Sequence, residues 1–259
     1  MKRSSRRHPL QGWYVISTRP LNQHGGLRRA AAASGARLFA ISTLALRPLD
    51  AGADATAALA CALVIATSPA AARCTAAGKR LAQRRGQQWF ALGAGTAAAL
   101  RRRGIAKVQR PDAGSDSEAL LALPALQDVD GRSVGLLTAP GGRGLIARTL
   151  RARGASVREA RVYRREQRAP SPARLAMLDS LPAPLAIALT SLEAFEPLWQ
   201  ALSPTQRRRL LASPCLVASD RLAEHARVLG FAIVLRAADA RPASLVRALV
   251  GHAGASRIR

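Results

Sequence analysis

Residues 12–20 read GWYVISTRP and residues 131–140 read GRSVGLLTAP. Each stretch begins at a glycine, continues through a short apolar run of the kind found in buried strands, and ends at a proline. A second pair of stretches shows the same relation, because residues 62–68 (ALVIATS) resemble residues 185–191 (LAIALTS). Matches that recur at an offset of about 120 residues predict an internal duplication and two similar lobes.

Short apolar segments alternate with alanine- and leucine-rich helical segments along the whole chain. We expect a helix over residues 26–34 and strands at 13–16, 37–45, 62–65, 89–92, 134–137, 185–189 and 215–218. Strands that are separated by helices predict parallel α/β sheets. Ligands of such sheets bind at the carboxyl ends of the strands, so the loops that follow the strands should hold the site.

The chain of 259 residues is strongly basic, with 40 lysines and arginines against 15 aspartates and glutamates and a formal charge of +25. This charge attracts polyanions such as nucleic acid, acidic lipid or a polycarboxylate substrate. Only Lys2, Lys79 and Lys107 are lysines, so the arginine content fits a GC-rich coding sequence as well as selection for binding. Aromatic residues make up 3% of the chain, which argues against a dedicated platform for single-stranded nucleic acid.

Composition also bears on cofactors and cellular location. The three cysteines and four histidines are scattered without the spacing of metal or redox pairs, and so few cysteines suit a reducing cytosol. No window reaches the roughly 18 apolar residues of a membrane helix. The basic residues 1–11 lack the apolar core of a secretory signal and are expected to form a tail. We therefore expect a cytoplasmic protein without a metal site or a membrane span.

Polar loops after the expected strands supply the candidate binding residues. The turn PGGRG at residues 140–144 matches neither a Walker loop nor a dinucleotide fingerprint. It is either a structural turn or a helix start that holds a carboxylate with the help of Arg143. Hydroxyl groups in the loops of both halves are likewise either helix caps or ligand donors. These candidates are Thr67, Ser68, Thr96, Thr190, Ser191 and Ser219, with Arg221 close to the last.

Tyr163 is one of only two tyrosines and lies at the end of an extended segment among Arg161, Arg164 and Arg165. A phenol beside cationic groups can donate a proton to a departing oxygen. The alternative is an ordinary strand residue whose ring packs and whose hydroxyl meets water.

The order of the short motifs resembles that of the uroporphyrinogen-III synthase family over residues 12–250. The motifs are residues 12–20, 67–69, 92–96 (LGAGT), 116–121 (DSEALL), 142–143, 154–155, 162–165 (VYRR), 219–223 (SDRLA) and 229–231 (LGF). The resemblance, which is to the proteobacterial type, implies two flavodoxin-like α/β domains joined by a two-stranded linker, with an active-site cleft between them. Domain 1 would hold residues 12–46 and 167–252 and domain 2 residues 47–166, with basic tails at 1–11 and 253–259.

The resemblance also implies a reaction. Members of the family are lyases of haem biosynthesis that dehydrate and cyclise hydroxymethylbilane, a linear tetrapyrrole with eight carboxylates, to uroporphyrinogen III with inversion of ring D. They need no cofactor. Tyr163 would donate the proton for loss of water, and the substrate would be bound by Arg19, Thr67, Ser68, Thr96, Arg143, Thr190, Ser191, Ser219 and Arg221.

We further expect a monomer, with the preceding enzyme of the pathway as a candidate partner and no dedicated nucleic-acid partner. Two alternatives stay open at this point. One is a non-catalytic two-lobed binder of anionic ligands, and the other is a basic nucleic-acid-associated protein.

Overall fold

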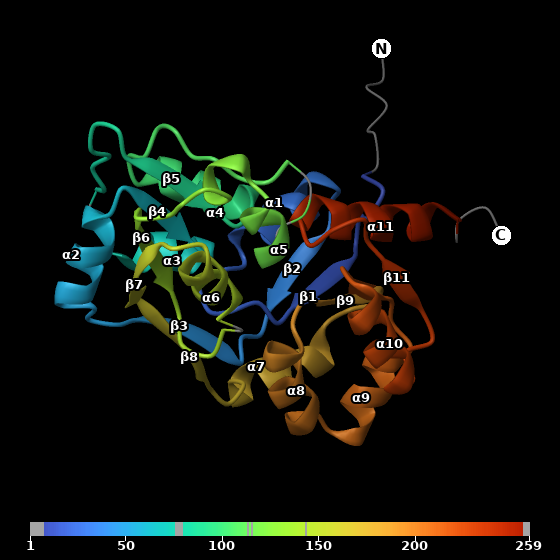
Figure 1. Ribbon diagram of the computed structural model, residues 1–259. Helices are drawn as coiled ribbons and strands as arrows, with labels where there is room; N and C mark the ends of the chain where they lie inside the picture. Colours follow the sequence, from blue (N-terminus) through green and yellow to red (C-terminus); the bar gives the residue numbers. More distant parts are fainter. Residues whose placement is uncertain (1–7, 76–79, 113, 115, 143, 256–259) are drawn as a thin grey trace, which may run out of the picture. The chain divides into compact units, whose positions relative to one another are not determined.

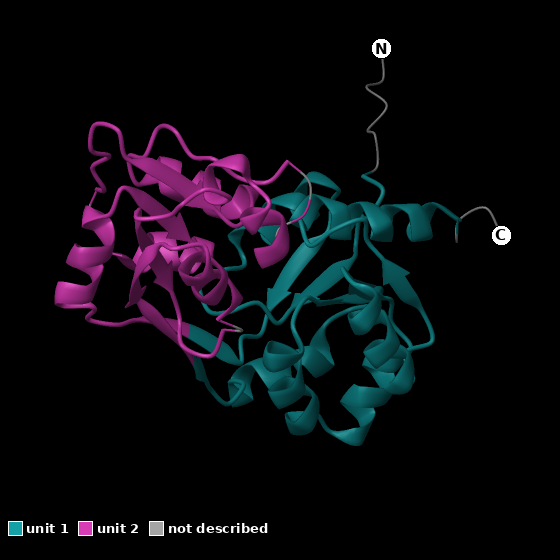
Figure 2. Ribbon diagram, viewed as in Figure 1, with its two compact units in different colours: residues 1–45, 166–259 teal, residues 46–165 magenta. Residues whose placement is uncertain are grey.

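The structure, a computed structural model, describes residues 8–75, 80–112, 114, 116–142 and 144–255 (Figure 1). The chain divides into two compact units (Figure 2). Unit 1 holds the chain up to Ala45 and from Glu166 onward, and unit 2 holds Leu46–Arg165. The sequence predicted that the chain passes between the domains after residues 46 and 166, which is one residue later in each case.

Unit 1 is built on a five-stranded sheet in the order β11-β10-β9-β1-β2, in which all paired neighbours are parallel. Its strands are β1 (Tyr14–Ser17), β2 (Arg37–Ala40), β9 (Leu185–Leu189), β10 (Cys215–Val217) and β11 (Val234–Arg236). Its helices are α1 (Gly25–Ala33), α7 (Pro172–Ser180), α8 (Leu192–Ala201), α9 (Pro204–Leu211), α10 (Asp220–Val228) and α11 (Pro242–Ala255).

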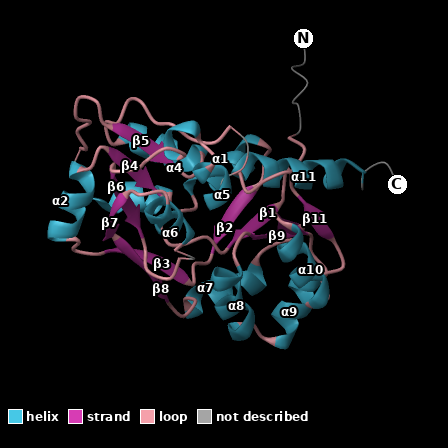
Figure 3. Cartoon of the chain, viewed as in Figure 1, coloured by secondary structure: helices cyan, strands magenta, loops and turns pink. Residues whose placement is uncertain are grey.

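Helices cover both faces of this sheet because its central strands are apolar on both sides (Figure 3). In β9, Leu185, Ile187 and Leu189 belong to the core cluster shared with α7, α8, α9 and α10. The intervening Ala186 and Ala188 belong to the cluster shared with α1 and α11. Successive side chains of a strand point to opposite faces, so one buried strand contributes to both cores.

Unit 2 is built on a four-stranded parallel sheet in the order β5-β4-β6-β7. Its strands are β4 (Leu63–Ala66), β5 (Gln88–Ala91), β6 (Ser133–Thr138) and β7 (Ser156–Arg161). Its helices are α2 (Gly52–Ala60), α3 (Pro69–Cys74), α4 (Ala94–Arg102), α5 (Ser117–Leu121) and α6 (Leu145–Ala152), with a 3-10 turn η2 (Pro124–Leu126).

The alanine content of unit 2 lets its helices approach the sheet closely. The core on one face contains alanines from α2, α3 and α4. Under α2, a Cβ atom at Gly135 of β6 would lie only 1.9 Å from the carbonyl oxygen of Ala58. Because backbone cannot move aside as a flexible side chain can, this position requires glycine.

Both sheets combine strands from the two halves of the duplicated sequence. The repeat makes β1 equivalent to β6, β2 to β7, β4 to β9 and β5 to β10. The order β10-β9-β1-β2 in unit 1 then corresponds to the order β5-β4-β6-β7 in unit 2, and β11 is additional. The structure therefore contains the two similar parallel-sheet lobes that the repeat predicts, each assembled from one part of each half.

The chain passes between the units in β3 (Leu44–Pro48) and β8 (Tyr163–Gln167), which pair as a separate two-stranded sheet. This is the expected two-stranded linker. The single strand predicted at residues 37–45 is wrong, since β2 ends at Ala40 and β3 begins at Leu44. The backbone changes partner in between, from the sheet of unit 1 to β8.

Some of the described residues lie in the expected tails. Leu10 is fully buried in the core beside α1 and α11, and its N–H donates to the carbonyl of Ser34 at 2.9 Å. Helix α11 continues to Ala255, and Ala253 is buried in the same core. The apolar side chains of Leu10 and Ala253 thus join the core, and the tails predicted at 1–11 and 253–259 are too long.

Candidate functional site

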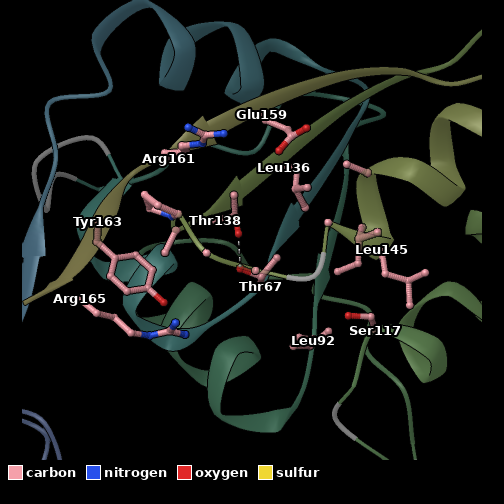
Figure 4. Close-up of a pocket in the computed structure, with 17 residues that line it drawn as sticks. Thr67, Leu92, Ser117, Leu136, Thr138, Leu145, Glu159, Arg161, Tyr163 and Arg165 are labelled. Atoms are coloured by element: carbon pink, nitrogen blue, oxygen red, sulfur yellow. Dashed lines mark hydrogen bonds between the residues drawn. The ribbon is translucent and has the colours of Figure 1, made fainter. Parts of the chain in front are cut away.

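A pocket of about 320 Å³ lies in unit 2 at the carboxyl ends of its strands (Figure 4). Its walls come from the ends of β4, β6 and β7, from the β6–α6 loop and the start of α6, and from β8. The polar and glycine residues that line it are Thr67, Ser117, Thr138, Gly141, Gly142, Gly144, Glu159, Arg161, Tyr163 and Arg165. The edge of the sheet is the one that the parallel topology predicts for a ligand.

Tyr163 reaches this pocket from the start of β8, with its ring buried in the core cluster of unit 2. Its hydroxyl accepts a hydrogen bond from Ser68 Oγ at 3.1 Å. Ser68 Oγ in turn accepts from the N–H of Ala71 at 3.0 Å and so caps α3. Since Ser68 gives its one proton to the phenol oxygen, the proton of Tyr163 is left for another acceptor.

Two threonines face each other at the ends of neighbouring strands (Figure 4). Thr67 Oγ1 and Thr138 Oγ1 are 3.3 Å apart, and Thr67 Oγ1 also donates to the carbonyl of Leu137 at 3.2 Å. This pair fixes the hydroxyl groups of the β4 and β6 ends relative to each other. Both threonines belong to the wall of the pocket.

The charged lining of the pocket is mainly cationic. Arg161, Tyr163 and Arg165 alternate along an extended segment, so their side chains share one face. Glu159 also lines the pocket, but its carboxylate forms an ion pair with Arg151 at 2.7 Å. The guanidinium groups of Arg161 and Arg165 therefore dominate the local charge and favour an anionic ligand.

The glycine turn leads into α6 and leaves the start of this helix open. Gly141 and Gly144 have φ angles of 82° and 66°, a region that favours glycine. The N-cap Gly144 has no side chain to cap the helix, and the first turn of α6 has no acidic residue. The free N–H groups there suit a carboxylate. Arg143, which was predicted to assist them, lies outside the described residues.

One other predicted residue of unit 2, Thr96, lies away from the pocket, and three residues that line the pocket were not predicted. Thr96 lies in the first turn of α4, is buried and does not line the pocket. Sequence reasoning gave no role to Thr138, Ser117 or Glu159. Thr138 ends the strand that matches VIST in the first half, so the repeat held a signal for it. Ser117 belongs to the DSEALL motif at residues 116–121, so it also had a signal, whereas Glu159 has none.

Five predicted residues lie in unit 1, in the segments that follow three neighbouring strands of its sheet. Arg19 follows β1, Thr190 and Ser191 follow β9, and Ser219 and Arg221 follow β10. Ser219 caps α10 by accepting from the N–H of Leu222 at 3.4 Å, whereas Ser191 makes no such cap bond at the start of α8. The structure thus brings these residues to the carboxyl edge of one sheet.

Arg19 is the most constrained of the five. One terminal nitrogen donates to the carbonyl of Ala240 at 3.2 Å, while the buried Nε has no hydrogen-bond partner among the described residues. Burial lowers the pKa of the Arg19 guanidinium. A buried cation without a partner on one nitrogen is costly, so an anionic group would be favourable beside it.

Two features are absent from the part of the chain that the structure describes. Its residues contain no group of three or more histidine, cysteine, aspartate or glutamate side chains placed to hold a metal ion. None of its helices has the length and apolar character needed to cross a membrane.

The fold and the pocket define a two-unit parallel α/β protein with a cationic pocket at the carboxyl edge of a sheet. The chain matches the family described as "Uroporphyrinogen-III synthase HemD" over residues 26–247, and it belongs to this family. It is 37% identical over 175 residues to the uroporphyrinogen-III synthase of Salmonella typhimurium strain LT2, covering 64% of this chain and 71% of that protein.

Two solved structures show the same fold. Uroporphyrinogen-III synthetase of Helicobacter pylori 26695 aligns with a TM-score of 0.58 and 12% identity, covering 95% of this chain and 99% of that chain. A mutant uroporphyrinogen III synthase of the extreme thermophile Thermus thermophilus aligns with a TM-score of 0.54 and 20% identity, covering 94% and 99%. The findings confirm the predicted family, the α/β fold class and the assignment to the lyases of haem biosynthesis, which process a small-molecule substrate.

Proposed function

We propose that this protein dehydrates and cyclises hydroxymethylbilane to uroporphyrinogen III, and that the pocket of unit 2 holds the reacting end of the substrate. The observation that carries the proposal is the placement of the Tyr163 hydroxyl. It lies in a cationic pocket, and its oxygen already accepts from Ser68, so its proton is available to a departing hydroxyl group. Membership in the family supports the same substrate.

In the proposed reaction, Tyr163 protonates the hydroxyl of the hydroxymethyl group as its carbon–oxygen bond breaks. Water leaves, and the electron pair of the adjacent pyrrole nitrogen forms the azafulvene. The substituted carbon of the terminal pyrrole then attacks to give the spiro intermediate, which reopens and recloses. Restoration of the aromatic ring releases one proton, which returns to the phenolate, so the net change is the loss of one water molecule.

Positioning contributes more to this reaction than proton transfer. Uncatalysed closure gives the uninverted isomer, so the protein must hold the tetrapyrrole in the spiro geometry. In unit 2, Arg161, Arg165 and the open start of α6 would bind carboxylates, with the hydroxyl groups of Thr67 and Thr138 beside them. Because the Thr67 proton already goes to Leu137 or Thr138, Thr138 would be the donor of the two. Ser68 would act by orienting the hydroxyl of Tyr163.

The other predicted residues remain proposed contacts for carboxylates of the same substrate. They are Arg19, Thr96, Arg143, Thr190, Ser191, Ser219 and Arg221. The unpartnered Nε of Arg19 and the uncapped start of α8 at Ser191 support two of them. Burial of Thr96 argues against direct contact by its side chain. The active-site cleft expected between the domains stays a prediction.

Location and assembly belong to the same proposal. We propose a cytoplasmic monomer that receives its unstable substrate from the preceding enzyme of the pathway. The free cysteines support a reducing compartment, since Cys61, Cys74 and Cys215 form no disulfide. Size-exclusion chromatography with light scattering checks the monomer, and a dimer at micromolar concentration would contradict it.

The decisive experiment supplies the purified protein with freshly made hydroxymethylbilane and separates the uroporphyrinogen isomers. The expected result is type III product in excess of the spontaneous type I product. Type I product alone, at the uncatalysed rate, would overturn the proposal and favour a non-catalytic binder of anions instead.

A further inference from the structure

A second pocket, of about 410 Å³, lies within unit 1. Its walls include the β1–α1 loop with the start of α1, and the residues that follow β2. By the repeat, these two parts are equivalent to the β6–α6 loop with the start of α6 and to the end of β7, which line the pocket of unit 2. The duplication has therefore placed a pocket at the same corner of both sheets.

This second pocket is cationic. Arg28 of α1 lines it together with Arg168 and Arg174, and all three are exposed residues. None of the described residues that line it is acidic. The guanidinium group of Arg174 lies over the ring of Phe39, 5.3 Å from its centre, which orients this side chain. Three like charges around one cavity repel each other unless an anion lies among them.

His24 forms the buried wall of the pocket and remains uncharged. Its Nδ1 lies 2.9 Å from Ser17 Oγ, and its Nε2 lies 2.7 Å from Ser42 Oγ. Ser42 Oγ donates to the carbonyl of Arg19 at 3.0 Å, so His24 Nε2 must donate to Ser42 and Nδ1 must accept from Ser17. Burial, and then the charges of Arg28, Arg19 and Arg174, lower the pKa of His24 to about 4.

Because both ring nitrogens of His24 are used within the protein, the imidazole shapes the pocket and leaves recognition to the arginines. The start of α1 adds to them. This helix has no side-chain cap at His24 and no acidic residue in its first turn, like its counterpart α6 in unit 2. The positive end of the helix therefore lies beside the cationic pocket without compensation from its own first turn.

We propose that this pocket is a second oxyanion site, which binds a carboxylate or phosphate group through Arg28, Arg168 and Arg174. The inference goes beyond the proposed function, because binding of a simple anion requires no turnover. Two sources supply this chemistry: a carboxylate of the tetrapyrrole substrate, and a free anion such as inorganic phosphate.

The test uses the full-length protein with isotope-labelled histidine and follows the ring signals of His24 by NMR during titration with inorganic phosphate and with succinate. The variant carries Arg28→Gln and Arg168→Gln together, which leaves the stacked Arg174 in place. Arg247→Gln, an exposed position on α11, is the matched control. We expect saturable shifts in the wild type and the control, with affinity roughly tenfold lower in the double variant.

Absence of any saturable shift in the wild type would overturn the proposal, as would equal affinity in the double variant. Turnover of hydroxymethylbilane then separates the two sources. A raised KM with unchanged kcat in the double variant assigns the site to the substrate, and an unchanged KM with lost phosphate binding assigns it to a free anion. Failure of the proposed function would leave the anion titrations readable, so the two failures are distinguishable.

Discussion

The Tyr163 hydroxyl shows how one hydrogen bond can determine the role of a residue. Its oxygen accepts from Ser68 at 3.1 Å, and Ser68 accepts from the N–H of Ala71 at 3.0 Å. The backbone N–H occupies one acceptor position of the Ser68 hydroxyl, and the Ser68 proton goes to the phenol oxygen. With the Ser68 proton on the phenol oxygen, the proton of Tyr163 is directed away from Ser68.

Tyr163→Phe should lower kcat by about 100-fold with little change in KM, because general acid catalysis contributes roughly 10²–10⁴-fold and the ring keeps its packing. Stopped assays that measure uroporphyrinogen III formation would give both constants. Tyr14→Phe is the matched control, since the Tyr14 hydroxyl accepts from Arg37 at 2.9 Å on the sheet of unit 1. Full turnover by the Tyr163 variant would remove the tyrosine from the mechanism.

Protonation of His24 makes the stability of unit 1 depend on pH. A pKa near 4 in the folded protein, against 6.5 when the residue is exposed, means that folding favours the neutral ring. The resulting stabilisation is complete above pH 6.5 and disappears as the pH falls through about 4. The shift corresponds to a free energy of unfolding on the order of 3 kcal/mol.

Denaturant unfolding at several pH values between 7 and 4 should therefore show a steep loss of stability in the wild type. His24→Gln replaces the imidazole with a neutral amide that does not gain a proton in this pH range, so its unfolding free energy should fall less over the same range. Arg28, Arg19 and Arg174 are the charges that oppose protonation, and they are present in both proteins. Parallel slopes for the two proteins would contradict the assigned role of the ring.

At the scale of elements, close contact between α2 and β6 is the clearest requirement of unit 2. Gly135→Ala places a Cβ atom 1.9 Å from a backbone oxygen, so it should lower the free energy of unfolding by roughly 1–3 kcal/mol. Gly251→Ala in α11 meets no atom within 4 Å and should be neutral or stabilising by up to about 1 kcal/mol. Thermal or urea unfolding checks the pair, and equal stability of the two variants would contradict the packing argument.

Several arginines have a role in helix ends that composition did not reveal. Arg103 donates to the carbonyls of Ala72, Arg73 and Thr75 at 2.7–2.9 Å and so completes the end of α3. Arg209 does the same for α7, with bonds to the carbonyls of Leu178 and Asp179. The forked guanidinium suits this task better than an ammonium group. Part of the +25 charge is thus explained by local structure.

The sequence predicted the parallel strands well because their signals are local. The strand at Leu185–Leu189 has the expected bounds, and those expected at 13–16, 62–65, 89–92, 134–137 and 215–218 differ by one residue at one or both ends. Strands β7 and β11 were not among the expected strands. The prediction was wrong at residues 37–45 (RLFAISTLA), where a segment without a turn signal contains a change of strand partner after Ala40. The run VREARVYRR hides the same change after Arg161. No glycine or proline marks either break, since tertiary pairing alone decides it.

The candidate site was predicted in part for a related reason. Thr67, Ser68 and Tyr163 belong to loops that the repeat singled out, and the structure brings them together. Glu159 was missed because a residue inside a strand gives no sign of facing a pocket. Thr96 occupies the expected loop, but helical geometry turns its side chain inward. Spacing along a chain predicts the edge of the sheet better than it predicts the direction of a side chain.

At the scale of the whole molecule, the two units differ in whether their cores come from one continuous segment of the chain. All buried members of the two cores of unit 2 lie between Ala55 and Tyr163, a continuous segment. The cores of unit 1 need residues from both ends, such as Val15 and Leu245. Four strands therefore have the same spatial order in the two units, but their connectivity and contact order differ.

A fragment of residues 44–167, which keeps both strands of the linker, should fold alone. We expect a cooperative unfolding transition by circular dichroism and dispersed NMR signals. The complementary segments, 8–43 and 168–255 expressed as separate chains, should show no such transition until they are mixed. An unfolded 44–167 fragment would contradict the independence of the core of unit 2.

The interleaved strand order also determines which unit can fold first during synthesis on the ribosome. Strand β1 leaves the exit tunnel early, yet its neighbour β9 lies beyond residue 184 and is made much later. Unit 2 can therefore fold before the sheet of unit 1 is complete, and until then one edge of β1 stays unpaired in the nascent chain. A message truncated before β9 would therefore release a folded unit 2 that carries an N-terminal segment with unpaired strand edges. Such edges pair readily with other chains, so this product would be a substrate for chaperones and proteases.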